Sequence, residues 1–268
     1  MDIPNTERVK ATALPAWLLS RGIASVTTDE AAALIGVPKN QVPQRMASLK
    51  KRNEIVPLAK GLWAPVPPEY RTWGAPPAID IINSVMRYIG VDYYVGWLSA
   101  AELLGASHHA PQVFQVAVSS ALRQKSIGRS VLKFYHRSHI SLIDTVNVET
   151  KNSPVPTSSK ETTLLDIASD IGLVGGIDNA ANLIIELCES PPGFNALAAL
   201  AAYYPSSAVR RLGYLMEHFT DNAEIEPLRA ISDSRQTSTS LLDPQSDNVG
   251  VVDVSWRLKI NREVDPDV

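Results

Sequence analysis

The sequence predicts an α+β protein with two domains. Its 268 residues are more than one typical domain contains, and 45% of them are apolar, enough for a core in each domain. Helical and strand-like patterns are mixed along the chain without the regular strand–helix–strand alternation of a parallel sheet. The proline-rich stretch 65–77 indicates a stiff connector. We place the boundary there, giving domains over residues 1–74 and 75–268.

The first predicted element is a helix over residues 6–20. Pro15 is expected to kink this helix, because proline lacks an N–H group and clashes with the preceding turn. The apolar residues that would pack on the following helices are Val9, Leu14, Leu18 and Leu19.

The segment TTDEAAALIG predicts a second, shorter helix. Thr27 and Glu30 have capping-box spacing, in which each side chain accepts a hydrogen bond from the other residue's backbone N–H. Gly36 can adopt the left-handed conformation that ends a helix, and Pro38 cannot continue one. The helix should therefore end at this glycine.

A third helix is predicted over residues 39–52. Pro43 is tolerated only within a first turn, so the regular part should begin near Asn40 or Gln41. Two short apolar runs, Ile55–Leu58 and Leu62–Pro65, then flank a Gly-containing turn and predict a hairpin. The buried face of the helix has residues spaced i, i+4 and i+7, namely Val42, Met46 and Leu49.

Two helices followed by a hairpin have the order of a winged helix-turn-helix, which indicates double-stranded DNA as the partner. Arginine can pair with guanine, and Asn or Gln with adenine, while cations at the helix end and at the wing tip suit phosphates. The alternative is an ordinary core without a DNA partner. The candidate DNA-binding residues are Lys39, Asn40, Gln41, Gln44, Arg45, Ser48, Lys51, Arg52 and Lys60.

Charge is divided unevenly along the chain, whose net charge is −3. Residues 1–74 contain ten Lys or Arg and six Asp or Glu, a formal charge of +4. The remaining residues contain fifteen and twenty-two, a formal charge of −7. A basic N-terminal domain joined to an acidic one fits a DNA-binding head with a second domain of another function.

The second domain is predicted to mix helices and strands, as expected for an α+β domain. A basic series along two of its strands offers a phosphate or RNA contact, or else a charged edge that resists aggregation. The series is Arg123, Lys125, Arg129, Lys133 and Arg137. The predicted helices cover residues 78–89, 99–104, 159–170, 178–188, 195–203, 207–219 and 226–231, and the strands 93–95, 113–118, 131–135 and 251–258, with a polar turn over 125–129.

Motifs for catalysis are missing from the sequence, so we expect no enzyme, no cofactor and no metal site. Neither GxxxxGK[ST] nor GxGxxG occurs. Asp253, Asp265 and Asp267 suggest a nuclease as an alternative, but they lack a second carboxylate motif with a following lysine. Cys188 is the single cysteine, the N-terminus lacks a signal peptide, and the longest apolar stretch is too short to span a bilayer. We expect a cytoplasmic protein that does not bind membranes.

Four strings resemble the AbiEi-type antitoxins of type IV toxin–antitoxin systems: Lys60–Trp63, Tyr94–Gly105, Thr157–Asp166 and Val252–Leu258. The resemblance implies that the head binds inverted repeats in its own promoter and represses the operon. It also implies that the second domain opposes a nucleotidyltransferase toxin without forming a stable complex with it. A nuclease and a ligand-responsive transcription regulator remain the alternatives.

Overall fold

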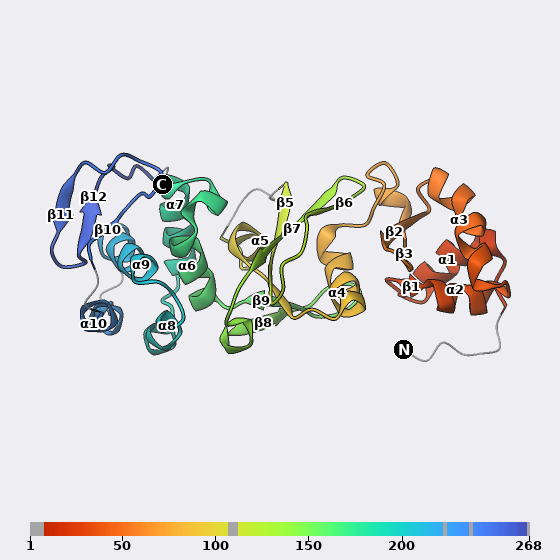
Figure 1. The fold of residues 1–268 in the computed structure, drawn as a ribbon, viewed down its shortest axis with the longest axis horizontal. Helices are drawn as coiled ribbons and strands as arrows, with labels where there is room; N and C mark the ends of the chain where they lie inside the picture. Colours follow the sequence, from red (N-terminus) through yellow and green to blue (C-terminus); the bar gives the residue numbers. More distant parts are fainter. Residues whose placement is uncertain (1–7, 107–111, 222–223, 236–237, 267–268) are drawn as a thin grey trace. The chain divides into compact units, whose positions relative to one another are not determined.

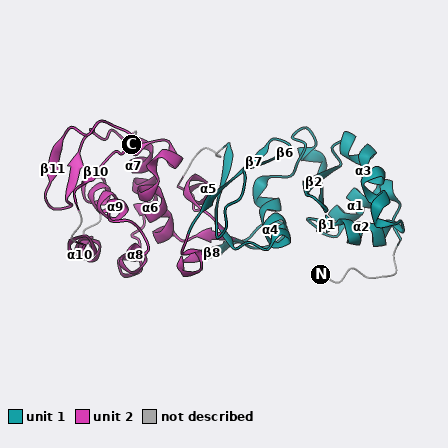
Figure 2. Cartoon of the chain, in the orientation of Figure 1, with its two compact units in different colours: residues 1–93, 112–137, 147–155 teal, residues 94–111, 138–146, 156–268 magenta. Residues whose placement is uncertain are grey.

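The computed structural model describes residues 8–106, 112–221, 224–235 and 238–266. The chain forms two compact units, each assembled from separate segments (Figure 2). The first unit comprises residues 1–93, 112–137 and 147–155, and the second comprises residues 94–111, 138–146 and 156–268. The mixed helices and strands confirm the predicted α+β class (Figure 1).

The first helix of the chain, α1, is shorter than predicted. It covers Leu14–Ser20 and follows a 3-10 turn at Ala11–Ala13. Pro15 lies in its first turn, where a missing N–H leaves no bond unmade, so the expected kink is wrong. The predicted start at Thr6 lies outside the described residues.

The second helix, α2, covers Thr28–Ile35 and has the capping box that its sequence predicted. The Thr27 N–H donates to Glu30 Oε2 at 2.7 Å, and the Glu30 N–H donates to Thr27 Oγ1 at 3.2 Å. Gly36 ends the helix with a φ of +67°. These local bonds explain why this helix could be placed from sequence.

Helix α3 covers Val42–Lys51 and follows a 3-10 turn at Lys39–Gln41. Pro43 occupies its first turn, as expected. The helix buries Val42, Met46 and Leu49, the three residues of the predicted face.

A three-stranded antiparallel sheet in the order β1-β3-β2 completes this part of the chain. Strands β2 (Ile55–Ala59) and β3 (Leu62–Pro65) form the predicted hairpin, and β1 (Val26–Thr27) adds a strand that the sequence did not predict. A hydrophobic cluster joins the sheet to the three helices. Its buried members are Leu14, Leu18, Val26, Ala31, Ala32, Leu34, Val42, Met46, Leu49 and Ile55.

The first unit continues beyond residue 74. The proline-rich stretch is held in place within it, because the Val66 N–H donates to the Glu54 carbonyl at 2.9 Å and the Arg129 N–H donates to the Trp73 carbonyl at 2.9 Å. Strand β6 pairs antiparallel with β7, which pairs parallel with β5. The polar turn predicted over residues 125–129 is therefore mostly strand. These elements are α4 (Ala78–Ile89), β5 (Val113–Val118), β6 (Lys125–Ile127) and β7 (Ser130–His136).

The second unit contains a series of helices and a small sheet in the order β10-β12-β11. A six-stranded sheet in the order β6-β7-β5-β4-β9-β8 includes β5, β6 and β7 of the first unit. The remaining elements are β4 (Tyr93–Val95), α5 (Trp97–Leu103), β8 (Thr145–Val148), β9 (Val155–Ser158), α6 (Lys160–Ser169), α7 (Ile177–Cys188), α8 (Phe194–Ala201), α9 (Ser206–Phe219), α10 (Glu226–Ser234), β10 (Ser240–Leu241), β11 (Val251–Asp253) and β12 (Leu258–Ile260).

The single strand predicted over residues 251–258 is wrong. Strand β11 ends at Asp253, and a turn leads into β12, which starts at Leu258. Trp256 lies in this turn and is fully buried, with its ring against Gly213 of α9. The chain turns here so that the Trp256 ring can be buried. The alternating apolar residues of this segment predicted a continuous strand instead. Across the described ranges, no helix is both long and apolar enough to cross a membrane.

Candidate nucleic-acid interface

Every candidate DNA-binding side chain is exposed. Because α3 buries Val42, Met46 and Leu49, its opposite side carries the polar residues. Lys60 lies in the turn between β2 and β3, also exposed. The exposed residues are Lys39, Asn40, Gln41, Gln44, Arg45, Ser48, Lys51, Arg52 and Lys60. Exposure leaves them available to a ligand, and their contact with DNA stays a prediction.

Two of these cations are already paired with carboxylates. Lys39 Nζ lies 2.8 Å from the Asp29 carboxylate. The Arg52 guanidinium donates two bonds to Glu54, from Nε at 3.0 Å and from a terminal nitrogen at 2.9 Å. Hydrogen bonding to Arg52 holds the pKa of Glu54 below its usual value, and raises that of Arg52 in return. Both pairs weaken the positive field of the surface.

The other cationic groups of the set have no internal partner within the described part of the chain. The guanidinium of Arg45 and the ammonium groups of Lys51 and Lys60 make no ion pair or hydrogen bond there. These three side chains can therefore turn toward a phosphate or a base without first breaking an internal contact. Lys39 and Arg52 differ from these three cations because carboxylates lie beside them, and helical spacing alone does not predict those carboxylates.

Hydrogen bonds to residues 71–73 connect the end of α3 with the β6–β7 turn. Asn53 follows the helix and donates from Nδ2 to the Arg71 carbonyl at 3.0 Å. Two residues further on, the Trp73 carbonyl accepts from the Arg129 N–H at 2.9 Å. Gly128 in the same turn lies so close to Trp73 and Gly74 that a side chain there would clash.

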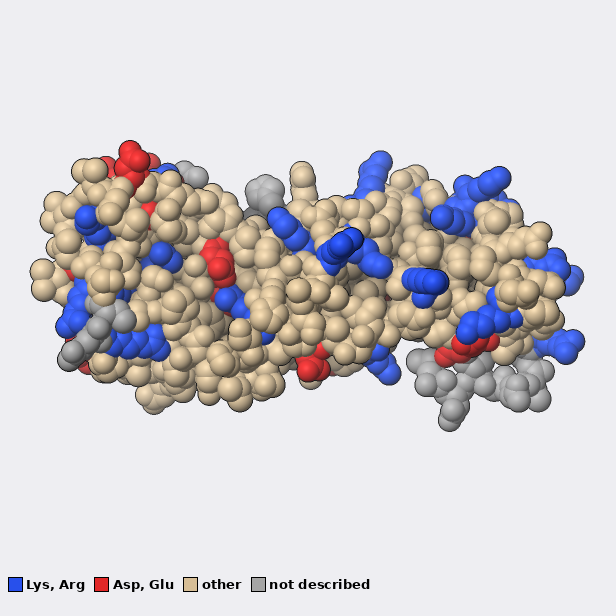
Figure 3. Space-filling model, viewed as in Figure 1, with Lys and Arg blue, Asp and Glu red and all other residues tan. Residues whose placement is uncertain are grey.

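The basic series therefore belongs to the first unit and not to a separate second domain. Arg123, Arg129 and Lys133 are exposed, and Figure 3 shows Lys and Arg side chains gathered over the elements of this unit. Divided by compact unit, the first has seventeen Lys or Arg and nine Asp or Glu, a charge of +8. The second has eight and nineteen, a charge of −11. The difference in charge between the two compact units is therefore larger than the difference between residues 1–74 and 75–268.

A cavity of about 360 Å³ lies in the first unit, where α1, the end of β3 and the start of α4 meet. Its walls are mainly apolar and include Pro65, Pro76 and Ile81. Asp80 and Lys151 supply opposite charges. Burial raises the pKa of the Asp80 carboxyl, and the nearby Lys151 ammonium opposes that rise. The volume is within the range of small-molecule sites.

The second unit has a buried polar core that sequence reasoning missed. Asp166 is fully buried and accepts hydrogen bonds from the hydroxyls of Tyr94 at 3.0 Å and Tyr204 at 2.9 Å. Arg211 is nearly buried and donates to the Leu242 carbonyl at 2.6 Å. Burial lowers the pKa of Arg211 to about 10. Buried polar groups need such partners, so these residues fix the packing of the helices.

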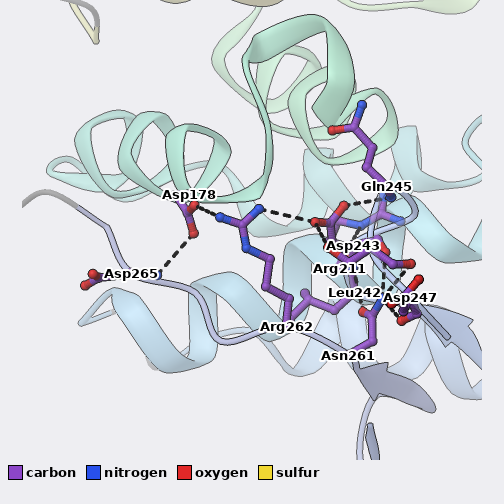
Figure 4. Close-up of polar contacts among 10 residues, drawn as sticks. Asp178, Arg211, Leu242, Asp243, Gln245, Asp247, Asn261, Arg262 and Asp265 are labelled. Carbon is purple, nitrogen blue, oxygen red and sulfur yellow. Dashed lines mark hydrogen bonds and ion pairs between the residues drawn. The ribbon is translucent and has the colours of Figure 1, made fainter. Parts of the chain in front are cut away.

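The C-terminal segment is fastened to the same unit (Figure 4). Arg262 bridges the carboxylates of Asp178 and Asp243, reaching the second at 3.4 Å. Asn261 Nδ2 donates to the carbonyls of Asp243 at 2.8 Å and Asp247 at 3.0 Å. These contacts hold the loop after β10 against α7 and serve the fold.

The Asp253 carboxylate, which belongs to the nuclease alternative, has a structural contact, because it accepts the Trp256 N–H at 2.8 Å. Asp265 is held through its backbone, whose N–H donates to the Asp178 carboxylate at 3.2 Å. Asp267 lies outside the described residues. Over the ranges that the structure describes, no group of three or more His, Cys, Asp or Glu side chains is arranged to hold a metal ion.

Known proteins resemble this chain over part of its sequence and over most of its fold. None of the curated proteins matches the chain. The crystal structure of the RV2827C protein from Mycobacterium tuberculosis has the same fold, with a TM-score of 0.69 at 17% identity, covering 95% of this chain and 94% of that one. Residues 94–218 match the family model of the AbiEi antitoxin C-terminal domain. This match confirms the predicted resemblance of the chain to the AbiEi-type antitoxins.

Proposed function

We propose that the protein is a DNA-binding transcriptional autorepressor and the antitoxin of a type IV toxin–antitoxin system. One observation carries the proposal: an exposed polar helix on a unit of charge +8 is joined, in the same chain, to a segment that matches the AbiEi antitoxin C-terminal domain. The operator would consist of inverted repeats in double-stranded DNA. The toxin would be a nucleotidyltransferase, opposed in the cytoplasm without a stable complex and without catalysis by the antitoxin.

The opposite charges of the two units support DNA binding by the first unit rather than the second. Phosphates attract the basic first unit and repel the acidic second one, so DNA should approach through α3 and its basic neighbours. Phosphate contacts from Lys51 and Lys60 would set position, and Asn40, Gln41, Gln44 and Arg45 would read base edges.

Repression is tested by binding to the DNA upstream of the protein's own gene. The purified chain should protect inverted repeats there, and a reporter driven by that DNA should be repressed. Arg45→Ala should relieve repression, whereas Lys160→Ala, which removes a cation from the second unit, should not. Binding that is equally strong on unrelated DNA would contradict a repressor of its own promoter.

Antitoxin activity is tested by growth. The proposal requires a nucleotidyltransferase gene beside this one. Cells that produce that enzyme should stop growing, and co-production of the chain should restore growth. Arg45→Ala should still restore growth, because the antitoxin domain lies over residues 94–218. Purified protein that cleaves DNA in the presence of divalent metal would favour the nuclease alternative instead.

A ligand-responsive regulator is the second candidate function, and the cavity beside Asp80 favours it. A small molecule there would contact both α1, which supports α3 through the shared core, and α4. Its effect would be a change in operator affinity. A compound that raises the melting temperature but leaves DNA affinity unchanged would count against this function.

A further inference from the structure

Helix α4 lies outside the segment predicted to bind DNA, yet its last turn touches the tip of the hairpin. The Tyr88 hydroxyl donates a hydrogen bond to the carbonyl of Lys60 at 2.9 Å. Tyr88 is 43% exposed, so core packing alone does not account for its position. Both residues belong to the first unit.

The same turn is also held by the first residue of α2. The Thr28 N–H donates to the Gly61 carbonyl at 2.8 Å, and the Trp63 indole N–H donates to the Thr28 hydroxyl at 3.0 Å. Gly61 has a φ of +91°, and a Cβ there would lie 2.7 Å from the Tyr88 hydroxyl oxygen. The turn therefore needs glycine for its conformation and for the close approach of Tyr88.

We propose that Tyr88 is a positioning residue for DNA binding, which fixes the hairpin turn so that the Lys60 ammonium reaches a phosphate. The inference rests on the proposed DNA-binding function. Lys60 has a long side chain on a two-residue turn, and ordering both on binding opposes affinity. A backbone already held by Tyr88 and Thr28 leaves only the side chain to be ordered.

The test is Tyr88→Phe in the full chain, because Phe keeps the ring and removes only the hydroxyl. Binding to duplex DNA from upstream of the gene is followed by fluorescence anisotropy over a series of salt concentrations. Loss of one hydrogen bond that orders the turn should weaken binding roughly two- to tenfold. The slope of log affinity against log salt should become shallower by up to about 0.9, the value for one phosphate contact.

A double-mutant cycle with Lys60→Ala separates positioning from general support of the fold. Lys60→Ala should weaken binding clearly in the wild-type chain and little in the Tyr88→Phe chain. Tyr203→Phe is the matched control, since Tyr203 is 41% exposed and belongs to the second unit, and it should change nothing.

Two results would overturn the inference. Additive losses from Tyr88→Phe and Lys60→Ala would show that Tyr88 acts independently of the wing cation. Wild-type affinity and salt slope in Tyr88→Phe would show that the hydroxyl has no part in binding. Failure of the wild-type chain to bind any duplex would instead reject the proposed DNA-binding function, so the two failures are distinguishable.

Discussion

Replacing Glu54 with glutamine should strengthen DNA binding. Arg52 directly follows α3, and its guanidinium donates to both carboxylate oxygens of Glu54, from Nε at 3.0 Å and from a terminal nitrogen at 2.9 Å. Its side chain is only 20% exposed, so the pair is partly shielded from solvent. In the wild-type chain this carboxylate occupies one edge of the Arg52 guanidinium and repels a phosphate that approaches it. Neutral glutamine removes the repulsion and holds Arg52 less strongly, while keeping the shape of the side chain.

The magnitude follows from the number of phosphate contacts. Each contact steepens the slope of log affinity against log salt by about 0.9. Over a change from about 50 to about 200 mM salt, one contact corresponds to about a 3.5-fold change in affinity. Glu54→Gln should therefore steepen the slope by up to about 0.9, because Arg52 becomes a full contact.

Salt-dependent anisotropy on a random duplex measures this slope without knowledge of the operator. Lys51 is the matched comparison, because no internal pair within the described residues holds it. Lys51→Ala should flatten the slope by about 0.9 in either background. Arg52→Ala should have a small effect in the wild-type chain and a full effect beside Glu54→Gln. Equal slopes for Lys51→Ala and Arg52→Ala, with Glu54→Gln unchanged, would refute the reasoning.

Three further changes test other parts of the structure. Arg45→Ala should cost about 1–3 kcal/mol on the operator and little on random DNA; equal losses would limit Arg45 to phosphate contact. Gly213→Ala should cost about 1–3 kcal/mol or more in urea unfolding, because the added Cβ overlaps the buried Trp256 ring; a loss below about 0.5 kcal/mol would contradict this packing. Asp80→Asn should raise the melting temperature at neutral pH. Burial raises the pKa of Asp80, so ionisation destabilises the fold as pH rises through that pKa, and the benefit of asparagine should vanish in acid.

The elements that could be predicted from sequence are those fixed by local chemistry. Thr27 and Glu30 cap α2 through a bond pair that spans three residues, and Gly36 ends it. Val42, Met46 and Leu49 share one face of α3 because helical periodicity puts them there. In each case, the residues that form the cap or the buried face lie within a few positions of one another in the sequence.

Elements that depend on distant partners could not be predicted. Strand β1 is two residues long and exists only because β3, almost forty residues away, pairs with Val26 and Thr27. The turn between β11 and β12 depends on the cavity that Gly213 leaves for Trp256. Likewise, the exposure of the candidate site followed from the period of α3, whereas the pairing of Lys39 with Asp29 required the packing of two helices.

The proline-rich stretch shows the same limit for domain boundaries. Prolines indicate a stiff connector when no partner is visible. Here the Ser130 hydroxyl donates to the Pro76 carbonyl at 3.3 Å, and Arg129 is bonded to Trp73. A segment from the middle of the chain therefore covers the stretch and extends the first unit. Whether residues 1–74 fold alone stays a prediction.

The prediction can be sharpened because the head has its own core. All ten buried members of the cluster lie between Leu14 and Ile55, so a fragment of residues 1–74 should unfold cooperatively in urea. It lacks Tyr88 and the basic β6–β7 turn, so it should bind random duplex DNA with a slope shallower by one or more contacts of about 0.9 each. Tyr88→Phe in the full chain should flatten the slope by the loss of one of those contacts. A fragment without a cooperative transition would show that the bonds around Trp73 and Pro76 are required for folding, and would reject residues 1–74 as a domain.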